Sequence, residues 1–349
     1  MKNMLKKAKT QKAKGKFSLF TLYFSLFTFY FLLIFGCNDS LRIISGQPDT
    51  TSVDDPMSEA TKIIREALAD ENPLIRINAI EVVAATRRAV LIPKVQRLLR
   101  DESVPVGFAA ALAMGDLEYS LAKSKVAQLL KDEDENIRIA AIYAMSRLGS
   151  TDSFELLRKA IVSSDQTVRA NAALLLGKSG DKSSLKFLYW ALRHKDSDDK
   201  VRFNAVEAIA RLGDERIYPK LWTMLISAYH DDRVFGIGAM GALGTIKAKN
   251  ALITMLDDDV LEVRLAAAEQ LGMLGYSTGE PVVLDIFTKN LTAGLNKEDT
   301  ERINVRTALA IGQIGTARLK KFLPQMLKDK SKFVRIAAAK AFFQCAMKN

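Results

Sequence analysis

Residues 132–149 read DEDENIRIAAIYAMSRLG, and residues 257–275 repeat the same pattern as DDDVLEVRLAAAEQLGMLG. In both segments an acidic turn precedes an arginine, and a glycine follows this arginine at a distance of eleven residues. Apolar or small residues recur at helical spacing between the turn and the glycine. The turn supplies residues that suit a helix N-cap, and the glycine suits the left-handed position that follows a helix. Each segment is therefore predicted to form one helix of about four turns.

The arginine of these segments recurs along the chain, first at multiples of 31 residues with one spacing of 33, and again after a longer eighth unit. The second unit has Gly107 in its place, and the eighth unit, nine residues longer than the period, has Asn304. The spacing of Asp134 and Arg138 suits an i,i+4 ion pair. The copies of the arginine are Arg76, Arg138, Arg169, Arg202, Arg233, Arg264 and Arg335. Residues of N-cap type stand four positions earlier in seven units: Asn72, Ser103, Asp134, Asp165, Asp198, Thr300 and Ser331.

A second amphipathic segment precedes each of these helices, as in IPKVQRLLRD (92–101) and LKFLYWALR (185–193). The repeated unit is therefore a helix–turn–helix, and about nine copies fill residues 58–349. Stacked helix pairs bury a continuous core that no single pair could build. We predict an all-α fold, an α-solenoid of about nine helix pairs with the shape of an elongated rod.

The repeat pattern, D-x-x-x-x-(V/I)-R-x-x-A-x-x-x-L-G, resembles the short HEAT-like repeats that also occur in phycocyanobilin lyases. The resemblance covers about 290 of the 349 residues. It implies an α-α superhelix in which the repeated arginine is a structural link between neighbouring repeats. It implies little about activity, because this repeat occurs in scaffolds, in adaptors and in a few enzymes.

The N-terminal segment has the composition of an export signal. Residues 1–36 contain seven lysines and no acidic residue, and the stretch 17–36 is uncharged. A basic region followed by an apolar region is typical of a secretory signal. The sequence I-F-G-C, which ends at Cys37, resembles the lipobox of bacterial lipoproteins, in the relaxed form found in spirochaetes. The resemblance implies that the signal is cut before Cys37 and that this cysteine carries lipid.

The alternative is an uncleaved signal anchor, because twenty apolar residues are long enough to span a bilayer. In either case the rest of the chain is expected outside the cytoplasm, since the lysines remain inside. Residues 37–57 contain no sustained period and are predicted to be a flexible tether. We expect the protein in the cell envelope, anchored to the inner or outer membrane and facing the periplasm or the cell surface.

Charge and composition exclude several function classes. The net charge of +11 falls to +4 without residues 1–36, so the basic composition does not argue for nucleic-acid binding. The two cysteines, Cys37 and Cys345, exclude a disulfide framework and a multi-cysteine metal site. No catalytic triad, Gly-rich phosphate loop or CxxC motif is present. We therefore expect no catalytic residue, no metal and no small-molecule cofactor.

A few residues are candidates for a binding surface. His194 and His230 are each predicted to end the first helix of a unit, where a cation is favourable. Among the aromatic residues of these helices, we expect most to be in the core and Tyr189 and Tyr218 to be exposed. The chain ends without a polar capping helix, which predicts that Phe342, Phe343 and Cys345 contact a partner or a second copy, although a buried structural role for Cys345 is the simpler alternative.

These observations favour a membrane-anchored, non-catalytic scaffold that binds another protein along the concave face of the solenoid. One alternative is an enzyme or lyase of the phycocyanobilin-lyase type, which rests on fold analogy. Another is a factor for envelope assembly that binds peptide or polysaccharide. Exposed tyrosine and tryptophan on the concave face would favour the latter, and a charged concave face would favour a protein partner.

Overall fold

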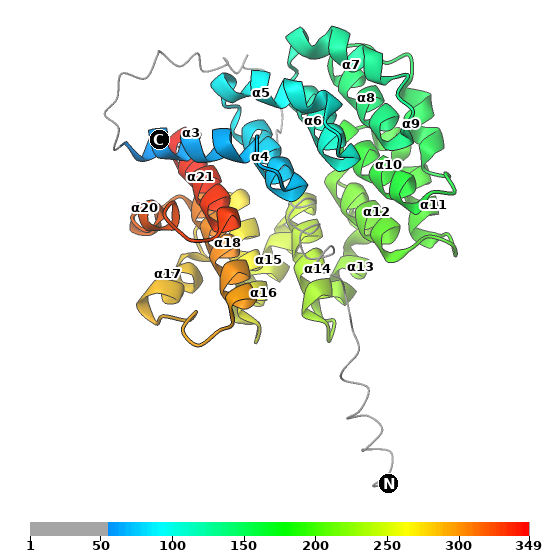
Figure 1. Cartoon of the computed structure of the whole chain (residues 1–349). Helices are drawn as coiled ribbons and strands as arrows, with labels where there is room; N and C mark the ends of the chain where they lie inside the picture. Colours follow the sequence, from blue (N-terminus) through cyan, green and yellow to red (C-terminus); the bar gives the residue numbers. More distant parts are fainter. Residues whose placement is uncertain (1–54, 349) are drawn as a thin grey trace, which may run out of the picture.

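The computed structural model describes residues 55–348, and every regular element in this range is a helix (Figure 1). The segment predicted to be a signal (1–36) and most of the predicted tether (37–57) lie outside the described residues. Within residues 55–348, no helix is both long enough and apolar enough to cross a membrane.

Over the described range the helices form nine pairs, each with one helix in an inner layer and its partner in an outer layer. This confirms the predicted helix pairs. The inner layer consists of α4 (Pro73–Thr86), α6 (Val104–Asp116), α8 (Glu135–Arg147), α10 (Gln166–Ser179), α12 (Asp199–Arg211), α14 (His230–Leu243), α16 (Leu261–Met273), α18 (Lys297–Ile314) and α21 (Lys332–Met347). The outer layer consists of α3 (Pro56–Ala67), α5 (Ile92–Arg97), α7 (Lys123–Leu129), α9 (Phe154–Ala160), α11 (Leu185–Arg193), α13 (Tyr218–Leu225), α15 (Ile246–Thr254), α17 (Glu280–Thr288) and the short pair α19 (Ala317–Lys320) and α20 (Leu323–Met326).

The ends of the inner helices follow the sequence signals closely. Six of the seven predicted N-caps precede an inner helix: Asn72, Ser103, Asp134, Asp165, Asp198 and Ser331. The prediction for Thr300 was wrong, because α18 begins at Lys297 and its N-cap is Asn296, whose side chain accepts a hydrogen bond from the backbone N–H of Asp299 at 2.8 Å. The additional residues of the eighth unit therefore lengthen its inner helix and the segment 289–296 before it, and they do not lengthen its outer helix.

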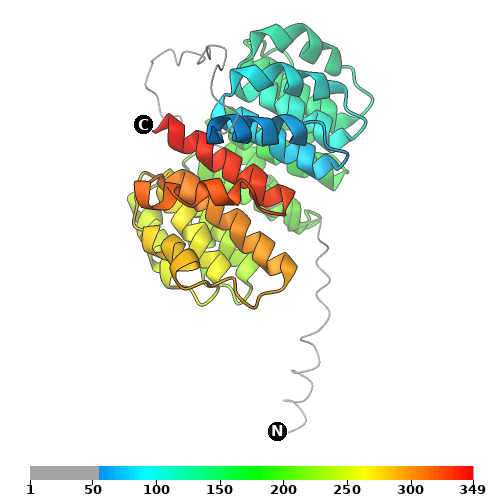
Figure 2. The ribbon, with the colours of Figure 1, turned by 60° about the vertical axis from the view of Figure 1, so that its left-hand side comes forward.

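The solenoid closes on itself into a ring. The C-terminal helix α21 packs against α3 and α4 at the other end of the chain (Figures 1 and 2). Lys332 of α21 pairs with Asp70, and the guanidinium of Arg88 lies 4.4 Å from the ring centroid of Phe343. The prediction of an elongated rod was therefore wrong.

Closure has a local cause in the size of the residues between the helices. The inner helices approach one another closely, since a Cβ atom added to Gly177 of α10 would lie only 2.5 Å from the Cβ of Ala208 of α12. The outer layer has larger side chains between its helices, as where the ring of Phe287 of α17 stacks on that of Phe322 with 3.8 Å between the centroids. Units that are narrow inside and wide outside turn the stack through a curve, and nine of them bring its two ends together.

Closure also changes the interpretation of the C-terminus. Phe343 is 1% exposed and Cys345 is 5% exposed, and both lie in the core that this chain forms alone. For these two residues the prediction of contact with a partner or a second copy was wrong, because the N-terminal repeat covers this end; Phe342 is partly buried against the same core. The simpler expectation, that Cys345 is a buried structural thiol, agrees with the structure, in which burial raises the pKa of this thiol.

Candidate functional site

The repeated arginines bond to the turn of their own repeat. Arg138 donates to the carbonyl oxygens of Asp132 and Glu133, both at 2.8 Å. These two residues lie in the turn between α7 and α8. The predicted i,i+4 pair with Asp134 is replaced by a helix cap, because the Asp134 carboxylate accepts from the backbone N–H of Asn136 at 2.7 Å. The other six arginines donate to carbonyl oxygens in the same way: Arg76, Arg169, Arg202, Arg233, Arg264 and Arg335.

Some of these arginines also reach the next repeat. Arg76 pairs with Asp101 at 2.7 Å, and both side chains are 8% exposed. Arg233 pairs with Asp258 and Asp259, each at 2.9 Å. Bonds of this kind hold the turns of neighbouring repeats together.

Charged side chains fill the centre of the ring. Lys178 of α10 lies 3.1 Å from the Asp116 carboxylate of α6, and the Tyr143 hydroxyl of α8 donates to the same carboxylate at 2.6 Å. Burial lowers the pKa of Lys178 to about 8. Burial, reinforced by Asp116, raises the pKa of Tyr143. Three consecutive inner helices thus meet through their own polar groups.

A second charged group lies where the ring closes. Lys340 of α21 contacts Glu81 of α4 at 2.7 Å, and Arg306 contacts Glu269 at 3.0 Å. Burial lowers the pKa of Lys340 and raises the pKa values of Glu81 and Glu269. At these positions the inner face is therefore occupied by side chains of the chain itself, and nothing in the described residues tests the expectation of binding along the concave face.

The candidate aromatic and histidine residues lie on or near the outer layer, but not as predicted. Tyr189 and Tyr218 are half-buried, and the outer-helix tryptophans are more exposed, at 37% for Trp190 and 41% for Trp222. Arg193 and Arg216 lie 5.1 and 5.3 Å from the ring centroid of Tyr189. The expectation that the two tyrosines are the exposed anchors was wrong, because cationic side chains cover them; Lys247 covers the ring of Tyr218 at 4.0 Å.

The two histidines occupy different kinds of position. His194 follows the last residue of α11, as predicted, and its ring lies 4.3 Å from that of Trp190. His230 was predicted to end a first helix, but it is the first residue of α14 and pairs with Asp231 at 3.2 Å. Within residues 55–348, no group of three or more histidine, cysteine or acidic side chains is placed to hold a metal ion.

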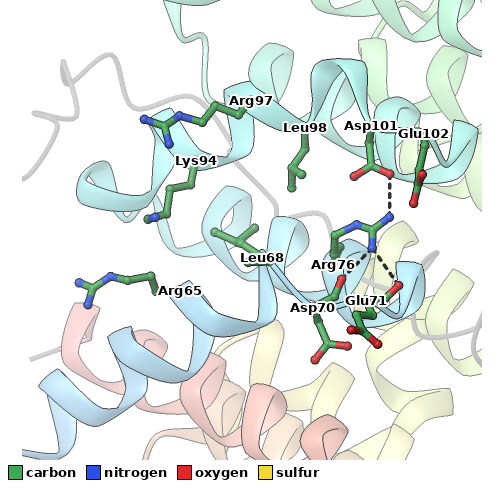
Figure 3. A pocket seen from close by; sticks show the side chains of 11 residues that line it. Arg65, Leu68, Asp70, Glu71, Arg76, Lys94, Arg97, Leu98, Asp101 and Glu102 are labelled. Atoms are coloured by element: carbon green, nitrogen blue, oxygen red, sulfur yellow. Dashed lines mark hydrogen bonds and ion pairs between the residues drawn. The ribbon is translucent and has the colours of Figure 1, made fainter.

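The candidate functional site is a groove between the first two repeats, which we call the α3–α5 groove (Figure 3). Its volume is about 550 Å³, within the usual range of ligand sites. Its walls come from α3, from α5 and from the turns that lead into α4 and α6. The groove is lined by Arg65, Leu68, Ala69, Asp70, Glu71, Arg76, Lys94, Arg97, Leu98, Asp101 and Glu102.

The two ends of the α3–α5 groove differ in charge. Figure 3 shows Arg65, Lys94 and Arg97 together at one end, whereas the acidic side chains gather around Arg76 at the other. Leu68 separates the two groups on the floor. The arrangement can bind a ligand that carries opposite charges at its two ends.

Sequence reasoning did not identify this groove, although part of its signal was visible. Asp70 and Asp101 are 31 residues apart, as are Glu71 and Glu102. The acidic residues of the groove therefore occupy equivalent positions of the first two repeats. The three basic residues occupy unrelated positions of the repeat, and only the packing of α3 beside α5 brings them together.

A comparison with protein families identifies the repeat. Residues 92–174 and 154–235 match the family model of HEAT repeats. These matches run from the second helix pair into the sixth, and the chain carries HEAT repeats over this stretch. None of the curated proteins matches the chain.

Several solved structures are similar at low identity. Human deoxyhypusine hydroxylase in complex with glycerol is 18% identical, over 83% of this chain and 98% of its own, with a TM-score of 0.36. The complex of CpcE and CpcF of phycocyanin lyase from Nostoc sp. is 18% identical, over 72% of this chain and 94% of its own, with a TM-score of 0.39. Kap121p is 15% identical, over 82% of this chain and 38% of its own, with a TM-score of 0.32. Likeness at this level says nothing about activity, substrate or partner.

Proposed function

We propose that this protein is a lipid-anchored scaffold outside the cytoplasm, and that its ring of helix pairs binds another protein without catalysing a reaction. HEAT-repeat solenoids commonly bind protein partners, through surfaces built from consecutive repeats. The observation that carries the binding part of the proposal is the α3–α5 groove, which presents unpaired basic and acidic side chains at its two ends.

The anchoring part of the proposal rests on the N-terminal sequence. Seven lysines precede twenty uncharged residues, and Cys37 follows Gly36 directly. Each buried CH₂ of an acyl chain contributes about 0.8 kcal/mol, so two or three chains hold a protein firmly on a membrane. The scaffold would then work in the cell envelope, facing the periplasm or the cell surface.

The buried charges at the centre of the ring give no support to the enzyme alternative. Lys178, Asp116 and Tyr143 satisfy one another and are almost completely buried. No observation favours a second function over protein binding.

The anchor is tested by metabolic labelling with a fatty-acid analogue in a bacterium that processes lipoproteins. We expect the unchanged chain to take up label at Cys37 and the Cys37→Ser variant to take up none. Cys345→Ser is the matched control, because it removes the other cysteine, which is buried. Equal label on Cys37→Ser would show that the cysteine is not acylated.

A further inference from the structure

The basic end of the α3–α5 groove has no partner within the protein. Arg65 and Arg97 are exposed and Lys94 is half-buried. Among residues 55–348, none of the three forms an ion pair or a side-chain hydrogen bond. They belong to two different helices, α3 and α5, and Figure 3 shows them on facing sides of the same end. Three cations held close together without an acid favour an anionic ligand.

The acidic end contains both satisfied and free carboxylates. Asp101 pairs with Arg76 at 2.7 Å, and Asp70 pairs with Lys332 at 2.5 Å. Glu71 and Glu102 are exposed, and within the described part of the chain their carboxylates have no partner. The free negative charge of the groove is therefore at Glu71 and Glu102.

A small apolar surface lies between the two charged ends. It belongs mainly to the partly buried Leu98, because Leu68 beside it is only 4% exposed (Figure 3). A free phosphate or a small organic acid would use the basic end alone and leave this surface uncovered. A nucleic acid would meet repulsion at Glu71 and Glu102.

We propose that the α3–α5 groove binds an extended segment of a partner protein that is acidic at one end, apolar in the middle and basic at the other end. The acidic residues of this segment contact Arg65, Lys94 and Arg97, and its basic residues contact Glu71 and Glu102. The two opposite charges fix which charged end of the segment lies at which end of the groove. This inference rests on the proposed protein-binding function and specifies the chemistry of the partner.

The test uses short peptides with blocked ends, DDLALKK and its reverse KKLALDD, together with KKLALKK and DDLALDD. Because the polarity of the bound chain is not fixed by charge, both orders are titrated against the full-length protein. We expect one of the first two to bind about tenfold more tightly than the two peptides of single charge. We also expect its binding to weaken with added salt.

A charge reversal separates binding from a structural effect. In Lys94→Glu/Arg97→Glu we expect about tenfold weaker binding of the preferred peptide and tighter binding of KKLALKK. Lys125→Glu is the matched control, since Lys125 lies 31 residues after Lys94, at the same position of the next repeat, and does not line the groove. Circular dichroism checks that all variants remain folded.

Other outcomes overturn the inference in distinguishable ways. Equal binding of all four peptides would show that the groove does not distinguish peptides by the order of their charges. Displacement of the preferred peptide by inorganic phosphate alone would show the same. A photo-crosslinking residue in place of Ala69, which lines the groove, is exposed and carries no charge, gives the second readout in intact cells. If it joins a protein while no peptide binds, the partner chemistry is wrong and the proposed function stands. If it joins no protein, and the same residue placed elsewhere on the outer helices joins none, the proposed function fails as well.

Discussion

Arg87 occupies the position at which the later repeats have glycine. Its backbone is left-handed, with φ of 50°, and Glu118 has the same φ at the equivalent position of the second repeat. In the third repeat this position is Gly149, with φ of 83°. A side chain makes the left-handed conformation unfavourable because its Cβ crowds the following carbonyl oxygen. The first two repeats therefore end their inner helices at an energetic cost that the others avoid.

We predict that Arg87→Gly stabilises the protein by about 0.5–1 kcal/mol, because glycine adopts this conformation without strain. The midpoint of urea unfolding, compared at constant slope, measures the change. Gly149→Ala is the reciprocal control and should lower stability, since a Cβ there meets no atom within 4 Å and only the backbone is affected. A lower midpoint for Arg87→Gly would mean that its side chain stabilises the fold.

At the scale of the element, the repeated arginines differ in how deeply they are buried. Arg169 is 5% exposed and donates twice to the carbonyl oxygen of Ser163, at 2.7 and 3.1 Å. The side chain of Arg202 is 41% exposed, and its bonds to the carbonyls of His194 and Lys195 are longer, at 3.5 and 3.3 Å. The same residue of the repeat therefore makes contributions of different size.

We predict that Arg169→Ala destabilises the protein by about 2–3 kcal/mol, because it leaves a carbonyl oxygen in a partly buried turn without its charged donor. Arg202→Ala should cost less than about 1 kcal/mol, because an exposed group forms weaker bonds in water. Thermal melts followed by circular dichroism compare the two. Equal melting temperatures for Arg169→Ala and the unchanged protein would contradict a structural role for the buried arginine.

The helices themselves were predictable from sequence because each carries its own signals. The N-cap, the small residues and the terminal glycine of α8 all lie within residues 134–149. The same register places Tyr229, four residues before Arg233, at the N-cap of α14, which would have assigned His230 to the start of that helix. The groove was not predictable, since the repeat places the first two outer helices side by side but does not indicate that Arg65 and Lys94 face the same end of a groove.

At the scale of the whole molecule, a few residues of α21 join the last repeat to the first. Lys340 stands among alanines in a stretch that is otherwise apolar, and a charge there requires a partner. Its ion-pair partner is Glu81, 259 residues earlier in the chain, and Glu269 also stabilises its charge. The sequence therefore indicated that Lys340 was unusual, but it contained no signal for ring closure.

We predict that Lys340→Met destabilises the protein by about 3–5 kcal/mol, since it leaves the Glu81 carboxylate unpaired in the closed ring. The double variant Lys340→Met/Glu81→Met should regain most of this loss, because no unpaired charge remains. Lys332→Met is the control on the same helix; its ion pair with Asp70 is 57% exposed on the lysine side and should be worth less than about 1 kcal/mol. Denaturant unfolding compares the variants, and equal losses for Lys340→Met and Lys332→Met would contradict a special role for the buried pair.

Ring closure also sets the number of repeats. An open solenoid can gain or lose a helix pair during evolution, because each pair contacts only its neighbours. Here α21 must meet α3 and α4, and the loss of one pair would open a gap of roughly one helix diameter, about 10 Å. The remaining junctions would have to bend to fill that gap, against contacts as tight as the one between Gly177 and Ala208. Duplication or deletion of a single unit would therefore disrupt the contacts that close the ring. For this reason the number of repeats is constrained here, whereas in open repeat arrays it is not.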